Sequence, residues 1–110
     1  MTKPKANKNL NRKMRKLKNI QRLLASSKNE LRRIYKVEEI GIFGSYSRGE
    51  QKRTSDVDIL VSFKPSATLF DFIGLGNYLE EKLNIKVDIV SERGIRPELR
   101  SDIIKGVLRV

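Results

Sequence analysis

The chain has 110 residues, of which 38% are hydrophobic, and its 24 Lys and Arg against 13 Asp and Glu give a formal net charge of +11. This length suits a single domain, and no apolar run approaches the ~18 residues that a membrane-spanning helix needs. The sequence has no cysteine and no histidine, which excludes disulfides, thiolate chemistry and the usual zinc sites. Any metal must therefore be held by oxygen ligands, which favours Mg²⁺ or Mn²⁺.

The positive charge is concentrated at the N-terminus. Residues 1–22 hold nine Lys or Arg and no acid, whereas residues 23–110 hold fifteen basic and thirteen acidic side chains. Such an arm suits a polyanion or an acidic protein partner, and equally a solvated tail that only aids solubility. Because the arm lacks an apolar stretch followed by a cleavage site, we predict no signal peptide and a cytoplasmic location.

The first predicted element is a helix. Residues 1–9 are polar and include Pro4, so we expect disorder there and a single domain over residues 10–110. The apolar side chains that follow recur every three or four residues, with Lys and Arg on the other face, which is typical of an amphipathic helix. These apolar positions are Leu10, Met14, Leu17, Ile20 and Leu24.

A second helix is predicted over residues 28–35, because Ser27 followed by Glu30 matches the capping-box pattern. The segment VEEIGIFGS at 37–45 then has the pattern of a strand that leads into a tight turn at Gly44.

Two further strands follow the polar segment 46–55. The strongest strand signal in the chain is DVDILVSF at 56–63. Its second half is nearly all apolar, as expected for a strand that is buried on both faces, and Pro65 ends it. The segment KVDIVS at 86–91 is a third, shorter strand.

Two more helices complete the predicted elements. Thr68 followed by Asp71 can cap a helix that runs to about Leu83, and Pro97 fits the first turn of a last helix. The side chains expected to face the core are Leu69, Phe72, Ile73, Leu79 and Leu83 in the first of these, and Leu99, Ile103, Ile104 and Val107 in the second. The element order predicts an α/β (α+β) fold, in which a small mixed sheet of three or four strands is flanked by helices.

Three aspartates are the candidate metal ligands. Asp56 and Asp58 stand at alternate positions of the predicted strand, so both side chains leave the same face, about 7 Å apart. Burying such charges is costly without a cation, and a two-metal site with ions about 3.5–4 Å apart suits in-line nucleotidyl transfer. Asp88 lies between Val87 and Ile89 and joins the pair if the two strands are adjacent and in register. The alternative is that these acids are ordinary exposed residues at strand edges.

A candidate phosphate site precedes the aspartates. A strand that ends in Gly44-Ser45, with a short helix expected to follow, offers backbone N–H groups and a hydroxyl to a phosphate. Ser45 would contact a terminal phosphate oxygen, and Arg48, followed by Gly49, could support the triphosphate or the acidic cluster. A Gly-Ser pair alone usually marks only a turn, but this one lies eleven residues before the Asp-x-Asp motif.

The segment GSYSRGEQKRTSDVDILV (44–61) resembles the signature of the polymerase-beta-like nucleotidyltransferase superfamily, in which Gly-Ser, Arg-Gly and Ser-Asp-x-Asp follow one another. The form IGIFGSYSRGE looks most like the minimal nucleotidyltransferase branch, and the resemblance spans about residues 20–108. It implies the polymerase-beta-like fold. By this resemblance Gly44-Ser45 matches the pair that grips the nucleotide, and Arg48-Gly49 matches the Arg-Gly of the family.

The same resemblance gives the aspartates their roles. Asp56 and Asp58 match the carboxylates that bridge two Mg²⁺ ions, for which Mn²⁺ can substitute. Asp88 matches the third carboxylate, which binds the catalytic metal and helps to activate the attacking hydroxyl.

The resemblance also implies a reaction and a partner. A nucleoside triphosphate, with ATP expected, would lose pyrophosphate as an acceptor hydroxyl attacks its α-phosphorus. Minimal members of the family are often paired with a small helical HEPN-type protein, as antitoxin to toxin, and adenylylate that partner, often on a tyrosine. Two alternatives remain open: a non-catalytic module that only binds a partner, and a transferase or binder that acts on nucleic acid through residues 1–22.

Overall fold

The computed structural model describes residues 16–110. The predicted disorder over 1–9 and the helix positions Leu10 and Met14 lie outside the described residues. The elements are α2 (Leu17–Ser26), α3 (Lys28–Tyr35), β1 (Val37–Phe43), β2 (Val57–Phe63), α4 (Leu69–Leu83), β3 (Val87–Ser91), the short 3-10 helix η1 (Glu92–Gly94), α5 (Pro97–Lys105) and β4 (Leu108–Arg109). In the described part of the chain, every helix is too short or too polar to cross a bilayer.

The four strands form one mixed sheet in the order β3-β2-β1-β4. β2 pairs in parallel with β3, and β1 pairs in antiparallel fashion with both β2 and β4. The predicted mixed sheet of three or four strands flanked by helices is therefore confirmed, and so are the predicted strands within a residue or two of their ends. Residues 24–42 and 57–85 supply most of the core.

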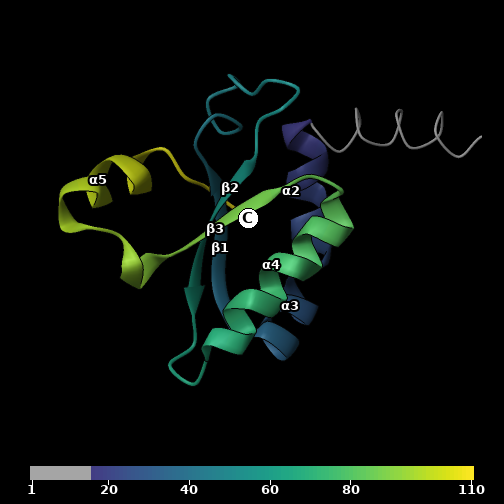
Figure 1. The fold of residues 1–110 in the computed structure, drawn as a ribbon, viewed down its shortest axis with the longest axis vertical. Helices are drawn as coiled ribbons and strands as arrows, with labels where there is room; N and C mark the ends of the chain where they lie inside the picture. Colours follow the sequence, from purple (N-terminus) through teal and green to yellow (C-terminus); the bar gives the residue numbers. More distant parts are fainter. Residues whose placement is uncertain (1–15) are drawn as a thin grey trace, which may run out of the picture.

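The helices lie on different sides of this sheet (Figure 1). α2, α3 and α4 pack together against one face, whereas α5 lies on the other side. Alternate residues of β2, among them Val57, Ile59 and Val61, are fully buried under the three helices. Side chains of the intervening positions, such as Asp58, therefore leave the opposite face of the sheet.

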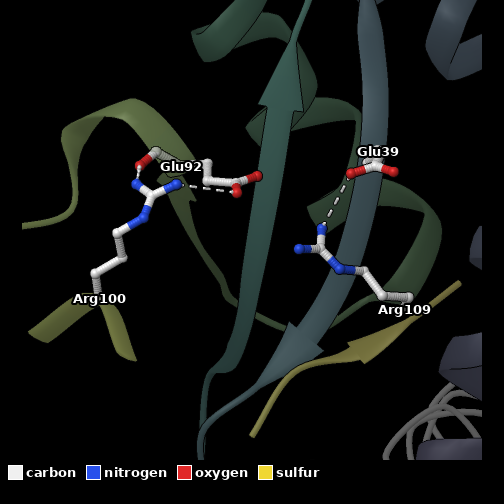
Figure 2. Close-up of polar contacts among 4 residues, drawn as sticks. All are labelled: Glu39, Glu92, Arg100 and Arg109. Carbon is white, nitrogen blue, oxygen red and sulfur yellow. Dashed lines mark hydrogen bonds and ion pairs between the residues drawn. The ribbon is translucent and has the colours of Figure 1, made fainter. Parts of the chain in front are cut away.

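β4 is a strand that the sequence did not predict. It has only two residues, so it shows no alternation of polar and apolar side chains. It approaches β1 closely because Gly41 has no side chain: a Cβ there would lie 2.7 Å from Val107 Cγ2 and 3.0 Å from the Leu108 carbonyl oxygen. Arg109 and Glu39 then pair across the two strands at 3.5 Å (Figure 2).

The predicted capping box at Ser27 is wrong, although the helix that it was expected to start does run over Lys28–Tyr35. Ser27 is also the C-cap residue of α2, and its N–H donates to the carbonyl oxygens of Leu23 and Leu24. Its backbone therefore lacks the extended conformation of an N-cap, and its side chain makes no capping hydrogen bond. Glu30 instead accepts a hydrogen bond of 2.8 Å from the Tyr78 hydroxyl on α4. This contact joins α3 to α4.

α4 confirms the predicted boundaries and corrects the predicted buried face. The Asp71 carboxylate accepts a hydrogen bond from the Thr68 amide, as the capping pattern predicts. Leu79 and Leu83 are buried as predicted, together with Leu75, whereas Leu69 and Ile73 are exposed. The buried stripe is centred on these three leucines, and Leu69 and Ile73 lie roughly a quarter to a third of a turn away from it.

α5 begins at Pro97 as predicted but has no fully buried residue. Leu99, expected to face the core, is half exposed, and Ile103 and Ile104 are only partly covered. Val107 lies beyond the end of the helix and packs on Gly41 instead. The helix therefore sits against the sheet only loosely, in agreement with its position in Figure 1.

Candidate functional site

The pairing of β2 with β3 brings two of the candidate carboxylates together. In the parallel register Asp58 stands beside Asp88, and Val57 stands beside Val87. Because neighbouring residues in register share a face of the sheet, the two carboxylates leave the same face, opposite to α2, α3 and α4. The predicted juxtaposition of Asp58 and Asp88 is confirmed, whereas their catalytic role stays a prediction.

Asp56 lies one residue before β2 rather than inside it, which corrects the expectation that the strand begins at Asp56. The strand begins at Val57, whose N–H bonds to the Lys86 carbonyl oxygen at 2.9 Å. Asp56 is exposed, while Asp58 is half-buried. The charge of Asp56 nevertheless contributes to the raised pKa of Asp58.

The register between β1 and β2 places the Gly-Ser turn at the same edge. Phe43, the last residue of β1, stands opposite Asp58. Gly44 follows with φ of +74°, a conformation that side chains disfavour. A Cβ on Gly44 would lie 3.0 Å from Asp58 Cγ and still closer to a carboxylate oxygen. Gly44 is therefore needed both for its backbone conformation and for the space that the carboxylate occupies.

Residues 44–49 form a series of turns instead of the short helix expected there. The Arg48 amide reaches the Gly44 carbonyl oxygen at 3.3 Å, and the Ser47 hydroxyl donates to the same oxygen at 2.9 Å. Gly49 has φ of +69°, which a continuing helix does not allow. The hydrogen bond of the Ser47 hydroxyl and the positive φ of Gly49 thus keep these residues from continuing into a helix.

The remaining two residues of the predicted phosphate site are Ser45, which is half-buried, and Arg48, which is exposed. The half-buried Ser45 has no hydrogen-bond partner for its hydroxyl within residues 16–110, and its carbonyl oxygen accepts from the Glu50 amide. Arg48 Nε donates to Glu50 Oε1 at 2.7 Å, and both side chains are exposed. Such an exposed ion pair is worth about 1 kcal/mol or less, so a ligand phosphate could replace the Glu50 carboxylate at low cost.

The electrostatics of this edge favour a cation. The pKa of Asp58 is raised, first by burial, then by the charges of Asp88 and Asp56, while Arg48 acts in the opposite direction. The charges of Asp88 and Asp56 thus make Asp58 harder to ionise, and a bound cation would offset that repulsion. In residues 16–110, no three acidic side chains are close enough to coordinate one ion as they stand. One or two carboxylates together with substrate phosphates and water are the usual ligands of Mg²⁺.

Tyr46 is a residue at this site that sequence reasoning missed. Its side chain is fully buried in the core, although it lies in a polar segment. Its carbonyl oxygen accepts from the Gly49 amide at 3.3 Å, so the residue connects the turn to the core. A large aromatic residue in a polar stretch is the signal that could have revealed it.

Comparison with known families gives a match over most of the chain. Residues 24–110 match the model of the nucleotidyltransferase domain family. The chain belongs to this family. The match covers Gly44 through Asp88, so the turn and the three carboxylates of this nucleotidyltransferase all fall within it.

Relatives and solved structures support the same conclusion. The protein adenylyltransferase MntA of Thermococcus cleftensis is 48% identical over 93 residues, which are 84% of this chain and 90% of the relative. A solved structure described as a candidate minimal nucleotidyltransferase is similar with a TM-score of 0.71 and 35% identity, over 83% of this chain and 95% of that one.

A third similar chain comes from a complex. It belongs to a structure described as tri-AMPylated Shewanella oneidensis HEPN toxin in complex with MNT antitoxin, and it aligns with this nucleotidyltransferase at a TM-score of 0.58 and 25% identity. The alignment covers 81% of this chain and 70% of that one.

Proposed function

We propose that this nucleotidyltransferase is a Mg²⁺-dependent protein adenylyltransferase, which transfers AMP from ATP to a hydroxyl of a helical HEPN-type partner and so acts as its antitoxin. The observation that carries the proposal is the pair Asp58 and Asp88, side by side on two parallel strands with the Gly44 turn at the same edge. The relative named protein adenylyltransferase and the complex with an AMPylated HEPN toxin support the choice of AMP and of the acceptor.

Nucleotide binding falls to the turn of residues 44–49. The Ser45 hydroxyl, which has no partner in the described chain, would donate to a phosphate oxygen of the nucleotide. Arg48 would exchange its exposed contact with Glu50 for the triphosphate. The glycine at position 44 lets the phosphates approach the backbone N–H groups of the turn.

The carboxylates Asp56, Asp58 and Asp88 would hold the divalent metal. When bound, Mg²⁺ neutralises phosphate charge and lowers the pKa of the attacking hydroxyl, and the family's chemistry uses two ions. The fit is chemical as well as topological, because burial and then the charges of Asp88 and Asp56 raise the pKa of Asp58, so a bound cation would stabilise its ionised form. Mn²⁺ prefers the same oxygen ligands.

The reaction balances without any further reactant. The acceptor oxygen forms a bond to the α-phosphorus of ATP as the bond between that phosphorus and the bridging oxygen breaks, and pyrophosphate leaves with the electron pair. The hydroxyl proton passes to a carboxylate or to solvent, and Asp88 is the exposed carboxylate nearest to Asp58 by register. The protein's part is to position the two substrates and to stabilise charge.

Incubation of the purified chain with α-labelled ATP, Mg²⁺ and a HEPN-type partner protein tests this function. We expect label on the partner and a mass increase of one AMP per modified hydroxyl. Asp58→Asn should abolish labelling, whereas Glu81→Gln, an exposed acid on α4, should not. If the partner binds but takes up no label from any nucleoside triphosphate, the chain is a binding module and not an enzyme.

A further inference from the structure

A cleft lies at the end of the sheet opposite to the carboxylates. Its volume is about 320 Å³, and it is bounded by the end of β2, the segment into the start of α4, and η1. Asp58 and Asp88, in contrast, lie at the starts of β2 and β3. Figure 1 shows this separation, with the start of α4 at the bottom of the view and the loop between β1 and β2 at the top.

The floor of this cleft, named here the α4 cleft, is aromatic and aliphatic. Phe63 and Phe72 line it with their rings in a tilted contact, at 48° and with centroids 6.1 Å apart, and Leu69 lines it as well. Phe70 and Ile73 continue the apolar surface along α4, and the exposed fractions are 71% for Leu69, 86% for Phe70 and 52% for Ile73. Three of the five large apolar side chains exposed in the described chain thus gather within five residues. A group of exposed apolar side chains is typical of an interaction surface, whereas single exposed apolar residues occur on most protein surfaces.

The charges around the α4 cleft are positive once the existing ion pairs are taken into account. Glu92 is held by Arg100, whose guanidinium also donates to the Glu92 carbonyl oxygen (Figure 2). Asp71, beside the cleft, is held by Lys36 at 3.5 Å. Lys64 and Arg93 line the cleft, are exposed, and make no ion pair within residues 16–110. The apolar floor therefore carries two uncompensated cations at its rim.

We propose that the α4 cleft docks a segment of a partner protein in which one or two large apolar side chains are flanked by Asp or Glu. The apolar anchors would fill the space between Phe63, Leu69 and Phe72, and the acids would pair with Lys64 and Arg93. A second copy of this chain is a poor occupant, because copies with a net charge of +11 repel each other. That the docked protein is also the protein that receives AMP rests on the proposed function, whereas the docking itself does not.

This location has a consequence for the proposed reaction. A partner held at the α4 cleft leaves the edge with Asp58 and Asp88 open to ATP. Binding of the partner and turnover can then be separated by substitution, since no residue of the cleft belongs to the proposed catalytic edge.

Two synthetic helical peptides test the proposal with the whole chain. One carries leucine and phenylalanine one turn apart with glutamates at the flanking positions, and its twin has lysines in place of the glutamates. Fluorescence polarisation is measured without ATP or Mg²⁺, so that a failure of the proposed function does not affect it. We expect the acidic peptide to bind at least about tenfold more tightly at low salt, with the difference reduced by high salt.

Substitutions then locate the site. Leu69→Ser removes an apolar wall of the cleft and should weaken the acidic peptide about thirtyfold, as for a central contact of an interface, whereas Phe70→Ser, outside the cleft, should have a smaller effect. Ile34→Ser, a matched exposed apolar residue on α3, should change nothing, and a double Lys64→Glu, Arg93→Glu variant should prefer the lysine peptide. Equal binding of both peptides, binding that survives Leu69→Ser in a folded protein, or dimers of the chain that dissociate on this substitution would each overturn the proposal.

Discussion

The carboxylate of Asp58 lies directly against the backbone of Gly44, at a distance that leaves no room for a side chain at position 44. A Cβ there would lie 3.0 Å from Asp58 Cγ and 3.2 Å from Asp58 Cβ. The relationship joins the turn that follows β1 to the carboxylates at the start of β2, because Phe43 and Asp58 are partners in the sheet. The position of the candidate phosphate site relative to the candidate metal ligands is thus determined by contact.

A series of three glycine substitutions separates this contact from backbone strain. Gly49→Ala meets no atom within 4 Å but has a positive φ, so it should cost about 1–2 kcal/mol of unfolding free energy. Gly44→Ala adds the collision with Asp58 and should cost more, roughly 2–4 kcal/mol, with loss of AMP transfer. Gly94→Ala meets neither problem and should stay within about 0.5 kcal/mol of the parent. Urea titration gives the three values, and a Gly44→Ala protein as stable as Gly94→Ala contradicts the contact.

Replacement of Asp58 should separate stability from ligand binding. The pKa of Asp58 is raised by burial and by Asp88 and Asp56, so the folded state without metal loses stability as pH rises through that raised pKa. Asp58→Asn removes this charge and should be at least as stable as the parent at pH 7 without metal.

With Mg²⁺ and ATP the order should reverse. At about one hundred times its dissociation constant, the ligand should stabilise the parent by about 2.7 kcal/mol and leave Asp58→Asn almost unchanged. AMP transfer should fall by at least about a hundredfold. Thermal denaturation with and without Mg²⁺–ATP measures both effects, and an equal shift in the two proteins would show that Asp58 does not contact the bound ligand.

Much of this fold could be predicted because local and long-range signals agree. β2 is recognised from its unbroken apolar half, and it is indeed buried on both faces at Ile59 and Leu60. In each of two short predicted strands, one aspartate lies between two apolar residues, Asp58 in the first and Asp88 in the second. If the two strands are adjacent and in register, these aspartates become neighbours on one face of the sheet. The adjacency itself depends on the crossover through α4, which the predicted strand-helix-strand order allows.

The parts that failed depend on contacts that periodicity does not encode. Leu69 and Ile73 have the spacing of a buried face, but the phase of α4 is set by Leu75, Leu79 and Leu83 deeper in the core. β4 exists because Gly41 lets a two-residue strand approach β1. β4 is too short to show a pattern, and in α4 the spacing of Leu69 and Ile73 competes with that of the three leucines, so only the tertiary structure reveals which set is buried.

The start of α4 should be sensitive to acid through Asp71. Its carboxylate accepts from the Thr68 amide at 2.8 Å and pairs with Lys36, and the hydrogen bond from Thr68 is the main reason that its pKa is lowered. A lowered folded pKa means that the stabilisation is present above the unfolded value of 3.8 and is lost as pH falls through the folded value. Asp71→Asn should therefore lower the urea midpoint at pH 7, and the difference should shrink as the pH falls below 3.8 and through the lowered pKa of Asp71. Asp102→Asn, an exposed acid on α5, is the control and should show no such convergence.

The buried hydroxyl of Tyr46 makes opposite predictions for two substitutions. Its side chain is fully buried, and its oxygen has no hydrogen-bond partner within residues 16–110. A buried polar atom without a partner is costly, so Tyr46→Phe should be neutral or should stabilise the chain by up to about 1 kcal/mol. Tyr46→Ala removes the ring that connects the turn to the core and should cost about 3–5 kcal/mol. The Phe variant should also keep the parent KM for ATP, because the ring alone positions residues 44–49. A Phe variant that is clearly less stable would show that the hydroxyl has a hydrogen-bond partner, and a raised KM in that variant would give this hydroxyl a part in nucleotide binding.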